Sequence, residues 1–422
     1  MIGLRRGLLV AFVVGLCCSI TLCEGALLLL TLLWLWRLRD PEVRAAQMWP
    51  LWGPVLAFAA ATLLSAFASG HVAASLAASK GLLLTAALYV TADALADARD
   101  GDRFLSWLGL AAAGAALASL LQVLACPSPE PARGLARWFF HRCDRARGFF
   151  SIYMTLAGVL SIALLALLPR LLPGGGLRLM WASPWLISLA GLVATYTRGA
   201  WIGFAAGAVS LLPTERRGRL LIVVGLVLLL GAAAVGPYEL RNRVRHMFDP
   251  GESGIVERRY MWQSGLAMWR ERPLLGWGPG GVKREYSRYA LPEAFKKRTG
   301  HVHNTPLQIV VERGIPGLAA WLAIWIAFYW QAISLLRRLD PGSTRERAIV
   351  MGSVAAVTGF LVGGLSEYSF GDSEVVMLAW TIMALPSVVA KGMTGPGTGP
   401  RTPAYDESGL SSCRRAPWTS EP

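Results

Sequence analysis

Charged residues are scarce in this sequence: of 422 residues, 16% are Asp, Glu, Lys or Arg, whereas 54% are hydrophobic. A soluble domain usually carries about 25% charged residues, so this composition excludes an ordinary soluble protein. Acidic residues are the scarcer kind, since 26 Asp and Glu oppose 41 Lys and Arg and leave a net charge of +15. A basic soluble protein would suggest a nucleic-acid partner, but the apolar content argues against nucleic acid. Six cysteines are too few for a disulfide-rich scaffold, and the composition fits neither disorder nor collagen.

Motifs for nucleotide and metal chemistry are also missing. The sequence contains no Walker phosphate loop, no CxxC pair and no HExxH. The glycine-rich segment 276–281, GWGPGG, lacks the Lys-Ser/Thr of a phosphate loop and predicts a turn. His301 and His303 lie two residues apart, and no Cys or acidic residue at ligand spacing completes a metal set. We therefore expect neither a metal nor another cofactor.

What the sequence does contain is a series of apolar runs, most of them close to the roughly 20 residues that a bilayer span requires. They predict an all-α polytopic membrane protein with about 12 transmembrane helices and one large periplasmic loop containing short helices. The runs lie near 8–23, 25–36, 50–68, 74–95, 104–125, 149–169, 180–196, 199–212, 219–236, 315–336, 347–368 and 373–391. No small-residue cleavage site follows the first run, so we interpret it as an uncleaved span rather than a signal peptide.

Basic residues in the short connections predict the orientation. With the N-terminus in the cytoplasm, several arginine clusters fall inside, whereas three opposite connections hold no Lys or Arg. The clusters are Arg5/Arg6, Arg37/Arg39/Arg44, Arg216/Arg217/Arg219 and Arg337/Arg338/Arg345/Arg347. An even number of spans also places the C-terminus in the cytoplasm, and the tail at 392–422 has the composition of a disordered segment.

Two outer segments are basic, and they divide the chain into its predicted parts. Residues 1–236 hold the first nine spans with a basic loop at about 126–148, and 315–391 hold the last three. Between them, the loop at 237–314 carries fourteen Lys/Arg against eight acidic residues. It is either a solvated loop near anionic headgroups or a basin for an anionic substrate. Cys126 and Cys143 share the first basic loop, where an oxidising periplasm would permit a disulfide.

Four arginines, two of them adjacent, and one histidine are candidates for chemistry. Arg147 closes the first basic loop, and Arg198 interrupts an apolar stretch, where it is either an interfacial anchor or an anion contact. The segment 256–270 is predicted to be an amphipathic helix with Arg258 and Arg259 in its first turns.

His303 lies just ahead of a predicted helix. Thr305 and Gln308 fit a capping box, Pro306 suits the first helical position, and Gly314 fits a C-terminal cap. Free backbone N–H groups at such a helix start favour anions, and a neutral imidazole beside them could act as a general base. A structural histidine bonded to a backbone carbonyl is the alternative.

The order of these motifs resembles the O-antigen ligase and O-antigen polymerase superfamily, most closely the ligases. The resemblance spans about 145–320. It rests on Arg147-Gly-Phe-Phe, Thr197-Arg-Gly-Ala-Trp201, Arg258-x-x-x-Trp262, Arg272-Pro-Leu-Leu-Gly-Trp-Gly-Pro-Gly280 and His303-Asn304…Glu312-x-Gly314-x-x-Gly317. Thr197 stands where serine is common in the family, and the adjacent Arg258 and Arg259 leave open which of them matches the family's basic residue.

The resemblance implies a metal-independent glycosyltransferase in the bacterial inner membrane, with its active site facing the periplasm. Its donor would be a glycan linked to undecaprenyl pyrophosphate, and its acceptor would be lipid A-core, both surrounded by membrane lipids. Arg198, Arg258 or Arg259, and Arg147 would hold the pyrophosphate, and His303 would be the general base. Asn304 would orient His303 or the helix start, and the reaction would invert the anomeric centre.

Three alternatives stay open at this point. A polymerase of the same superfamily would join lipid-linked repeats, and a related ligase would attach the glycan to protein. A small-anion transporter is the candidate from another class, but such transporters tend to carry internal repeats that this sequence lacks. A scaffold that binds lipid-linked glycan without catalysis would be separated from an enzyme by replacement of His303.

Overall fold

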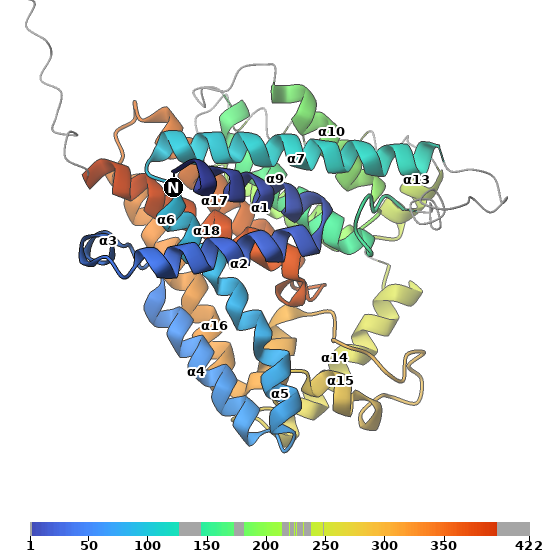
Figure 1. The fold of residues 1–422 in the computed structure, drawn as a ribbon. Helices are drawn as coiled ribbons and strands as arrows, with labels where there is room; N and C mark the ends of the chain where they lie inside the picture. The colour runs from blue at the N-terminus through green and yellow to red at the C-terminus, as the bar shows by residue number, and fades with distance from the viewer. Residues whose placement is uncertain are drawn as a thin grey trace, which may run out of the picture.

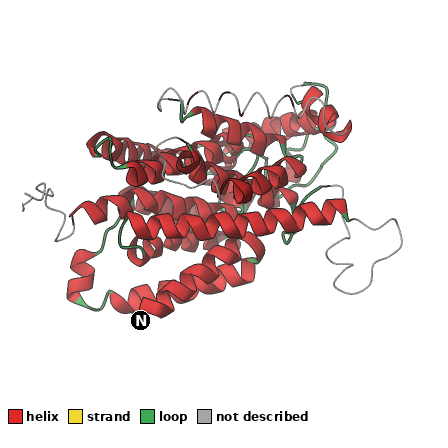
Figure 2. Ribbon diagram, turned by 90° about the horizontal axis from the view of Figure 1, so that it is seen from above, coloured by secondary structure: helices red, strands yellow, loops and turns green. Residues whose placement is uncertain are grey.

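The computed structural model describes residues 2–125, 145–172, 181–212 and 238–394 except 248, with isolated positions between 219 and 231. Every regular element within these ranges is helical, which confirms the predicted all-α class. Figure 1 shows one bundle in which some helices run across the view and others run obliquely below them, and Figure 2 shows the same bundle from above. Cys126, Cys143 and the tail from residue 395 lie outside the described residues, so the predicted disulfide does too.

The first half of the bundle is built from paired helices. The elements are α1 (Ile2–Cys18), α2 (Ile20–Arg37), α3 (Pro41–Ala46), α4 (Trp52–Ala68), α5 (Val72–Ala78), the 3₁₀ segment η1 (Ser79–Thr85), α6 (Ala86–Ala94), α7 (Ala98–Leu124), α9 (Tyr153–Leu171), α10 (Ala182–Ala194) and α11 (Arg198–Val209). Most of the predicted apolar runs in this half correspond to these helices, whereas the run at 219–236 lies almost wholly outside the described residues.

The second half contains the short helices of the large loop and three long helices. These are α13 (Tyr238–Arg245), α14 (Ser253–Glu271), α15 (Gly281–Glu285), η3 (Tyr286–Arg288), α16 (Thr305–Arg338), α17 (Thr344–Gly363), η4 (Ser369–Gly371) and α18 (Ser373–Thr394). The predicted amphipathic helix at 256–270 is present as α14. Gly314 interrupts α16 with φ 65° and ψ −170°, so the predicted helix end and the following span meet at this break.

Among the described residues, seven helical segments are long and apolar enough to cross a membrane: α2, the continuous α5–η1–α6, α7, α9, α16, α17 and α18. The apolar helices α4 and α10 are shorter, at 17 and 13 residues. The chain is therefore a polytopic helical membrane protein, while the count of about 12 spans stays a prediction.

Close helix packing at the centre of the bundle fixes the position of α11 against α17. A Cβ added to Gly203 would lie 2.5 Å from the carbonyl oxygen of Gly359, and one added to Gly207 would lie 2.5 Å from that of Ala355. Small residues at such contacts let helix backbones approach closely, which is the usual way in which membrane helices pack. The start of α11, at Arg198, thereby lies next to the end of α17.

The two ends of the bundle carry different polar groups. At one end Arg5 and Arg37 pair with Asp93, and Arg170 pairs with Asp102 at 2.7 Å. The positive-inside pattern predicts that this end faces the cytoplasm. The large-loop helices α14 and α15 lie toward the opposite end, away from the N-terminus and α3 (Figure 1). A separate cluster of buried side chains holds these helices against α16: Met261, Met268, Trp277, Val282, Tyr286, Val302 and Val311.

Candidate active site

The start of α16 positions the candidate base. Asn304 is the N-cap residue, because its side-chain oxygen accepts a hydrogen bond from Leu307 N at 2.9 Å. The capping box predicted for Thr305 and Gln308 is therefore wrong by one residue. The Gln308 amide instead accepts from Val302 N at 3.0 Å and donates to Glu312 at 2.9 Å.

Thr305 and Asn304 dock this helix start onto the connection between α17 and α18. Thr305 N donates to Gly364 O at 2.7 Å, the Thr305 hydroxyl donates to Glu367 O at 2.9 Å, and Asn304 Nδ2 donates to Leu365 O at 2.9 Å. Three hydrogen bonds thus hold the helix start on this connection. It brings residue 303 against residue 367, although 64 positions separate them in the chain.

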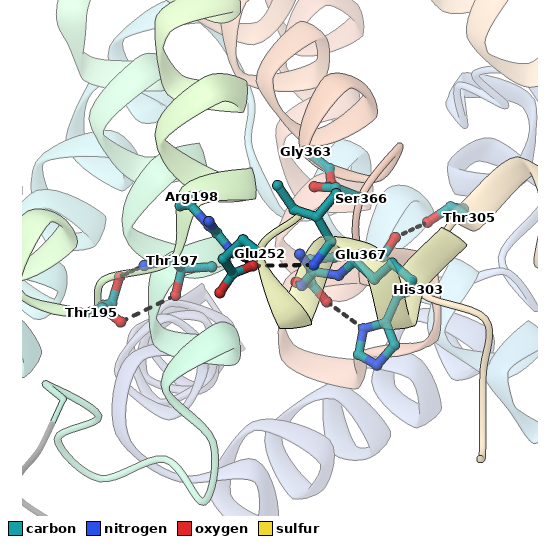
Figure 3. Close-up of polar contacts among 11 residues, drawn as sticks. Thr195, Thr197, Arg198, Glu252, His303, Thr305, Gly363, Ser366 and Glu367 are labelled. Carbon is teal, nitrogen blue, oxygen red and sulfur yellow. Dashed lines mark hydrogen bonds and ion pairs between the residues drawn. The ribbon is translucent and has the colours of Figure 1, made fainter. Parts of the chain in front are cut away.

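His303 forms a hydrogen-bonded pair with Glu367 (Figure 3). The distance from His303 Nδ1 to Glu367 Oε2 is 2.8 Å, and the two side chains are only 13% and 11% exposed. Because a carboxylate accepts, Nδ1 is assigned the proton, which leaves the lone pair of the neutral ring on Nε2. His303 has φ 49°, a conformation that L-residues seldom adopt and that clusters at functional sites.

The second oxygen of Glu367 pairs with Arg258 on α14. A single carboxylate thus joins the histidine to an arginine. Arg258 is half-buried, whereas its neighbour Arg259 is exposed on another side of the helix. The structure therefore brings Arg258, and not Arg259, to Glu367, the carboxylate that bonds His303.

Arg198 lies beside this pair, at the first turn of α11. Its Nη2 bonds Glu252 at 2.7 Å, and its Nη1 donates to His246 O at 2.9 Å. Glu252 also caps α14 by accepting from Ile255 N at 3.1 Å, so α14 carries both an arginine of the site and the partner of another. A Cβ added to Gly199 would lie 3.6 Å from Glu367 Cγ, so the backbone next to Arg198 touches the Glu367 side chain.

Arg147 lies at the neighbouring junction of α7, α9 and α10. It is 8% exposed, its backbone N donates to Gln122 at 3.2 Å, and Ala146 N donates to Ala194 O at 3.0 Å. The segment is thus tied to the end of α10, four residues before Arg198. Arg147 is a neighbour of the His303 site rather than one of its mutually bonded groups.

A cavity of about 240 Å³ opens beside Glu367. Apolar side chains of α9, α11, α17 and α18 form much of its wall, and its polar lining includes Thr197, His301, Glu367 and Asp372. The His301 ring lies 4.3 Å from the His303 ring, centroid to centroid. Burial, and then the proximity of His303, lower the pKa of His301 to about 4, so His301 is uncharged at neutral pH.

The sequence motifs identified Arg198, Arg258 and His303 but missed both carboxylates, Glu252 and Glu367. Glu367 did leave a signal, since it is an acidic residue in a short connection between two apolar runs that holds no Lys or Arg. Among the described residues, no three His, Cys, Asp or Glu side chains are grouped as a metal site would require. The groups that the structure assembles are a histidine–carboxylate pair and two guanidinium groups, which suit proton transfer beside an anion.

The sequence was compared with models of known protein families. Residues 184–322 match the family model described as O-antigen ligase. No curated protein matches the chain. The matched segment contains Arg198, Arg258 and His303, and it ends before Glu367.

Proposed function

We propose that this membrane protein is a glycosyltransferase of the ligase type, since residues 184–322 match the family model described as O-antigen ligase. It moves a glycan from undecaprenyl pyrophosphate to a sugar hydroxyl of lipid A-core, at the periplasmic face of the bacterial inner membrane. The observation that carries the proposal is the Glu367 carboxylate, which bonds His303 with one oxygen and pairs with Arg258 through the other, with Arg198 beside it.

His303 is the general base in this proposal. The acceptor hydroxyl oxygen attacks the anomeric carbon, the bond from that carbon to the pyrophosphate oxygen breaks, and the hydroxyl proton passes to His303 Nε2. Glu367 holds the ring by Nδ1 and stabilises the imidazolium that forms, as the third member of a catalytic triad does. Asn304 supports the base by holding the helix start on Leu365. Attack opposite the leaving group inverts the anomeric centre.

Arg198 and Arg258 hold the pyrophosphate and stabilise the negative charge that it gains as it leaves. A guanidinium group suits this role because its planar fork can donate to two phosphate oxygens at once. The apolar cavity beside Thr197 and Glu367 lies where the first isoprene units of the donor lipid would follow. Arg147 supports this side of the site from the adjacent junction, and no metal takes part.

A polymerase that joins two lipid-linked repeats would use the same groups, since it differs only in the acceptor. To separate the two, the gene is introduced into matched bacterial hosts that lack either the ligase or the polymerase. A restored lipopolysaccharide ladder in the ligase-deficient host alone supports the proposal, and restoration in the polymerase-deficient host alone overturns the choice of acceptor.

His303→Ala tests the base in the same hosts. His71→Ala is a matched control, because the His71 side chain is 58% exposed and lies 3.7 Å from Glu285. We expect His303→Ala to abolish the ladder and His71→Ala to retain it at equal amounts of membrane-inserted protein. Transfer by the purified protein in detergent would exclude the small-anion transporter, because transport requires two compartments.

A further inference from the structure

A second and larger cavity, of about 570 Å³, lies on the other side of the α17–α18 connection. Its apolar wall comes mainly from α2, η1 and α18, and α16 contributes polar groups. Tyr368 and Gly371 line both this cavity and the smaller one next to Glu367. Tyr368 follows Glu367 directly in the chain, so the connection that holds the histidine separates the two spaces.

The rim of the larger cavity lies on the bundle surface that an apolar medium would cover. Leu28 on α2 is 58% exposed and Leu83 on η1 is 74% exposed, and both line the cavity. η1 is a seven-residue 3₁₀ stretch between α5 and α6, within a segment that is apolar enough to span the membrane. 3₁₀ runs of this length are uncommon, and inside a helix they often mark a hinge. The cavity therefore opens toward the surface that the bilayer would cover, beside this 3₁₀ stretch.

Two lysines give this cavity a basic mouth. Lys80 on η1 and Lys283 on α15 are both exposed and both line it. Within the described part of the chain neither lysine forms an ion pair. An ionisable side chain in a membrane-spanning segment is costly, and it usually marks a functional site.

Two carboxylates line the same cavity, and they differ in how far they are available to neutralise the two lysines. Glu312 is already held by Arg313 at 3.2 Å and by Gln308 at 2.9 Å. Glu24 lies in the first turns of α2 and is exposed. Arg313 is thus taken by Glu312, and Lys80 and Lys283 are the lining cations that form no ion pair within the described residues, with Glu24 as the acidic group that shares the cavity with them.

We propose that this cavity binds the lipid part of the acceptor, a phosphorylated and multiply acylated glycolipid that enters sideways from the bilayer. Its acyl chains lie along α2 and η1, and its phosphates contact Lys80 and Lys283. The sugar end then reaches His303 past Tyr368, on the side opposite the arginines that hold the donor. The name acceptor rests on the proposed function, whereas the binding of a phosphorylated lipid does not.

The test measures binding of lipid A, which carries two phosphates, to the purified full chain in nanodiscs of neutral lipid. One variant is Lys80→Gln combined with Lys283→Gln. The other is Gly81→Phe, which adds a large side chain at a cavity-lining position where a Cβ meets nothing within 4 Å. Matched controls are Lys297→Gln, in the loop outside the cavity, and Gly114→Phe, on α7, where a Cβ also meets nothing within 4 Å.

We expect the double variant to bind lipid A about thirtyfold more weakly, since a basic residue near an anionic lipid surface contributes a factor of roughly five. Gly81→Phe is expected to lose most of the binding, and both controls to keep it. Undecaprenyl pyrophosphate, added as a second probe, is expected to bind all five proteins equally. The proposal would be overturned if the double variant and Gly81→Phe bound lipid A as tightly as the parent. It would also be overturned if these variants lost binding of undecaprenyl pyrophosphate and kept binding of lipid A.

Transfer kinetics separate this inference from the proposed function. In the double variant the KM for the acceptor rises while the KM for the donor and kcat stay the same. If no preparation transfers glycan but lipid A binding still depends on Lys80 and Lys283, the lipid site stands and the proposed reaction is wrong.

Discussion

Replacing Glu367 with glutamine is the sharpest test of how the site works. The change keeps the size and shape of the side chain but removes the charge that bonds His303 at 2.8 Å and pairs with Arg258. At 11% exposure the carboxylate is poorly reached by water, so its charge acts on both neighbours with little screening. The backbone docking through Thr305 uses the carbonyl of residue 367 and survives the substitution.

The size of the effect follows from these contacts. A hydrogen bond to a charged group contributes about 1.5–3 kcal/mol, so losing the one to His303 slows the reaction by about ten- to 150-fold. The glutamine amide can also donate to Nδ1, which would place the ring proton on Nε2 and remove the base. The comparable aspartate-to-asparagine change in a serine protease triad costs about 10⁴ in kcat. We therefore expect kcat to fall by roughly 10 to 10⁴, while the KM for the donor stays level or falls because Arg258 is released.

The assay is transfer from undecaprenyl-pyrophosphate glycan to lipid A-core by purified protein, with each substrate varied in turn. Glu293→Gln is the matched control, since Glu293 is an exposed residue of the large loop. Thermal unfolding in detergent checks that the variants remain folded. If Glu367→Gln retains kcat within about twofold of the parent at equal folded amounts, Glu367 does not position the base, and the mechanism fails.

Three further outcomes follow from other contacts of the site. Arg198→Lys is expected to raise the KM for the donor roughly tenfold with a smaller change in kcat, because an ammonium cannot bind two oxygens as a fork does; donor titration of the same transfer assay measures it. Gly314→Ala is expected to destabilise the protein by at least about 2 kcal/mol, because its φ and ψ are almost exclusive to glycine and a Cβ would overlap the carbonyl oxygen of Leu274. Denaturant unfolding checks this against Gly300→Ala, where a Cβ meets nothing within 4 Å. The pKa of His301 is 6.5 in the unfolded chain and about 4 in the folded chain, so the unfolded chain takes up the proton first as the pH falls. The free energy of unfolding therefore falls by about 3 kcal/mol between pH 6.5 and pH 4. In His301→Gln the melting temperature is expected to depend less on pH across this range.

Helix positions were largely predictable because apolar length and stop signals are local properties of the chain. Gly314 and Pro316 divided the helix at 305–313 from the following span, and the structure has its break at Gly314. The number of spans was less accessible, since α10 has 13 residues where the sequence suggested a run of 17 at 180–196. The 3₁₀ segment η1 could not be predicted, because its apolar sequence suits an α-helix equally well.

The sequence identified several residues of the candidate site, but it did not identify the side chains that they bond to. Arg198 stood out because it interrupts an apolar stretch, Arg258 because it lies in the first turns of a predicted amphipathic helix, and His303 because it precedes a predicted helix start. Glu367 escaped because its partner is 64 residues away, and the two meet only when the start of α16 docks on the α17–α18 connection. The choice between Arg258 and Arg259 depends on which face of α14 is turned toward Glu367. Two adjacent arginines in a sequence do not indicate that face.

Both arginines of the site are held by carboxylates that have a second task. Glu252 pairs with Arg198 while it caps α14, and Glu367 pairs with Arg258 while it holds His303. In the proposed reaction a pyrophosphate that binds both arginines displaces two carboxylates, and we expect weaker anions to displace them less readily. Once Arg258 has turned to the donor, the whole charge of Glu367 faces the imidazole and stabilises its protonated form more strongly. In the proposed reaction the base then reaches full strength only after the donor is bound, so donor binding precedes activation of the acceptor hydroxyl.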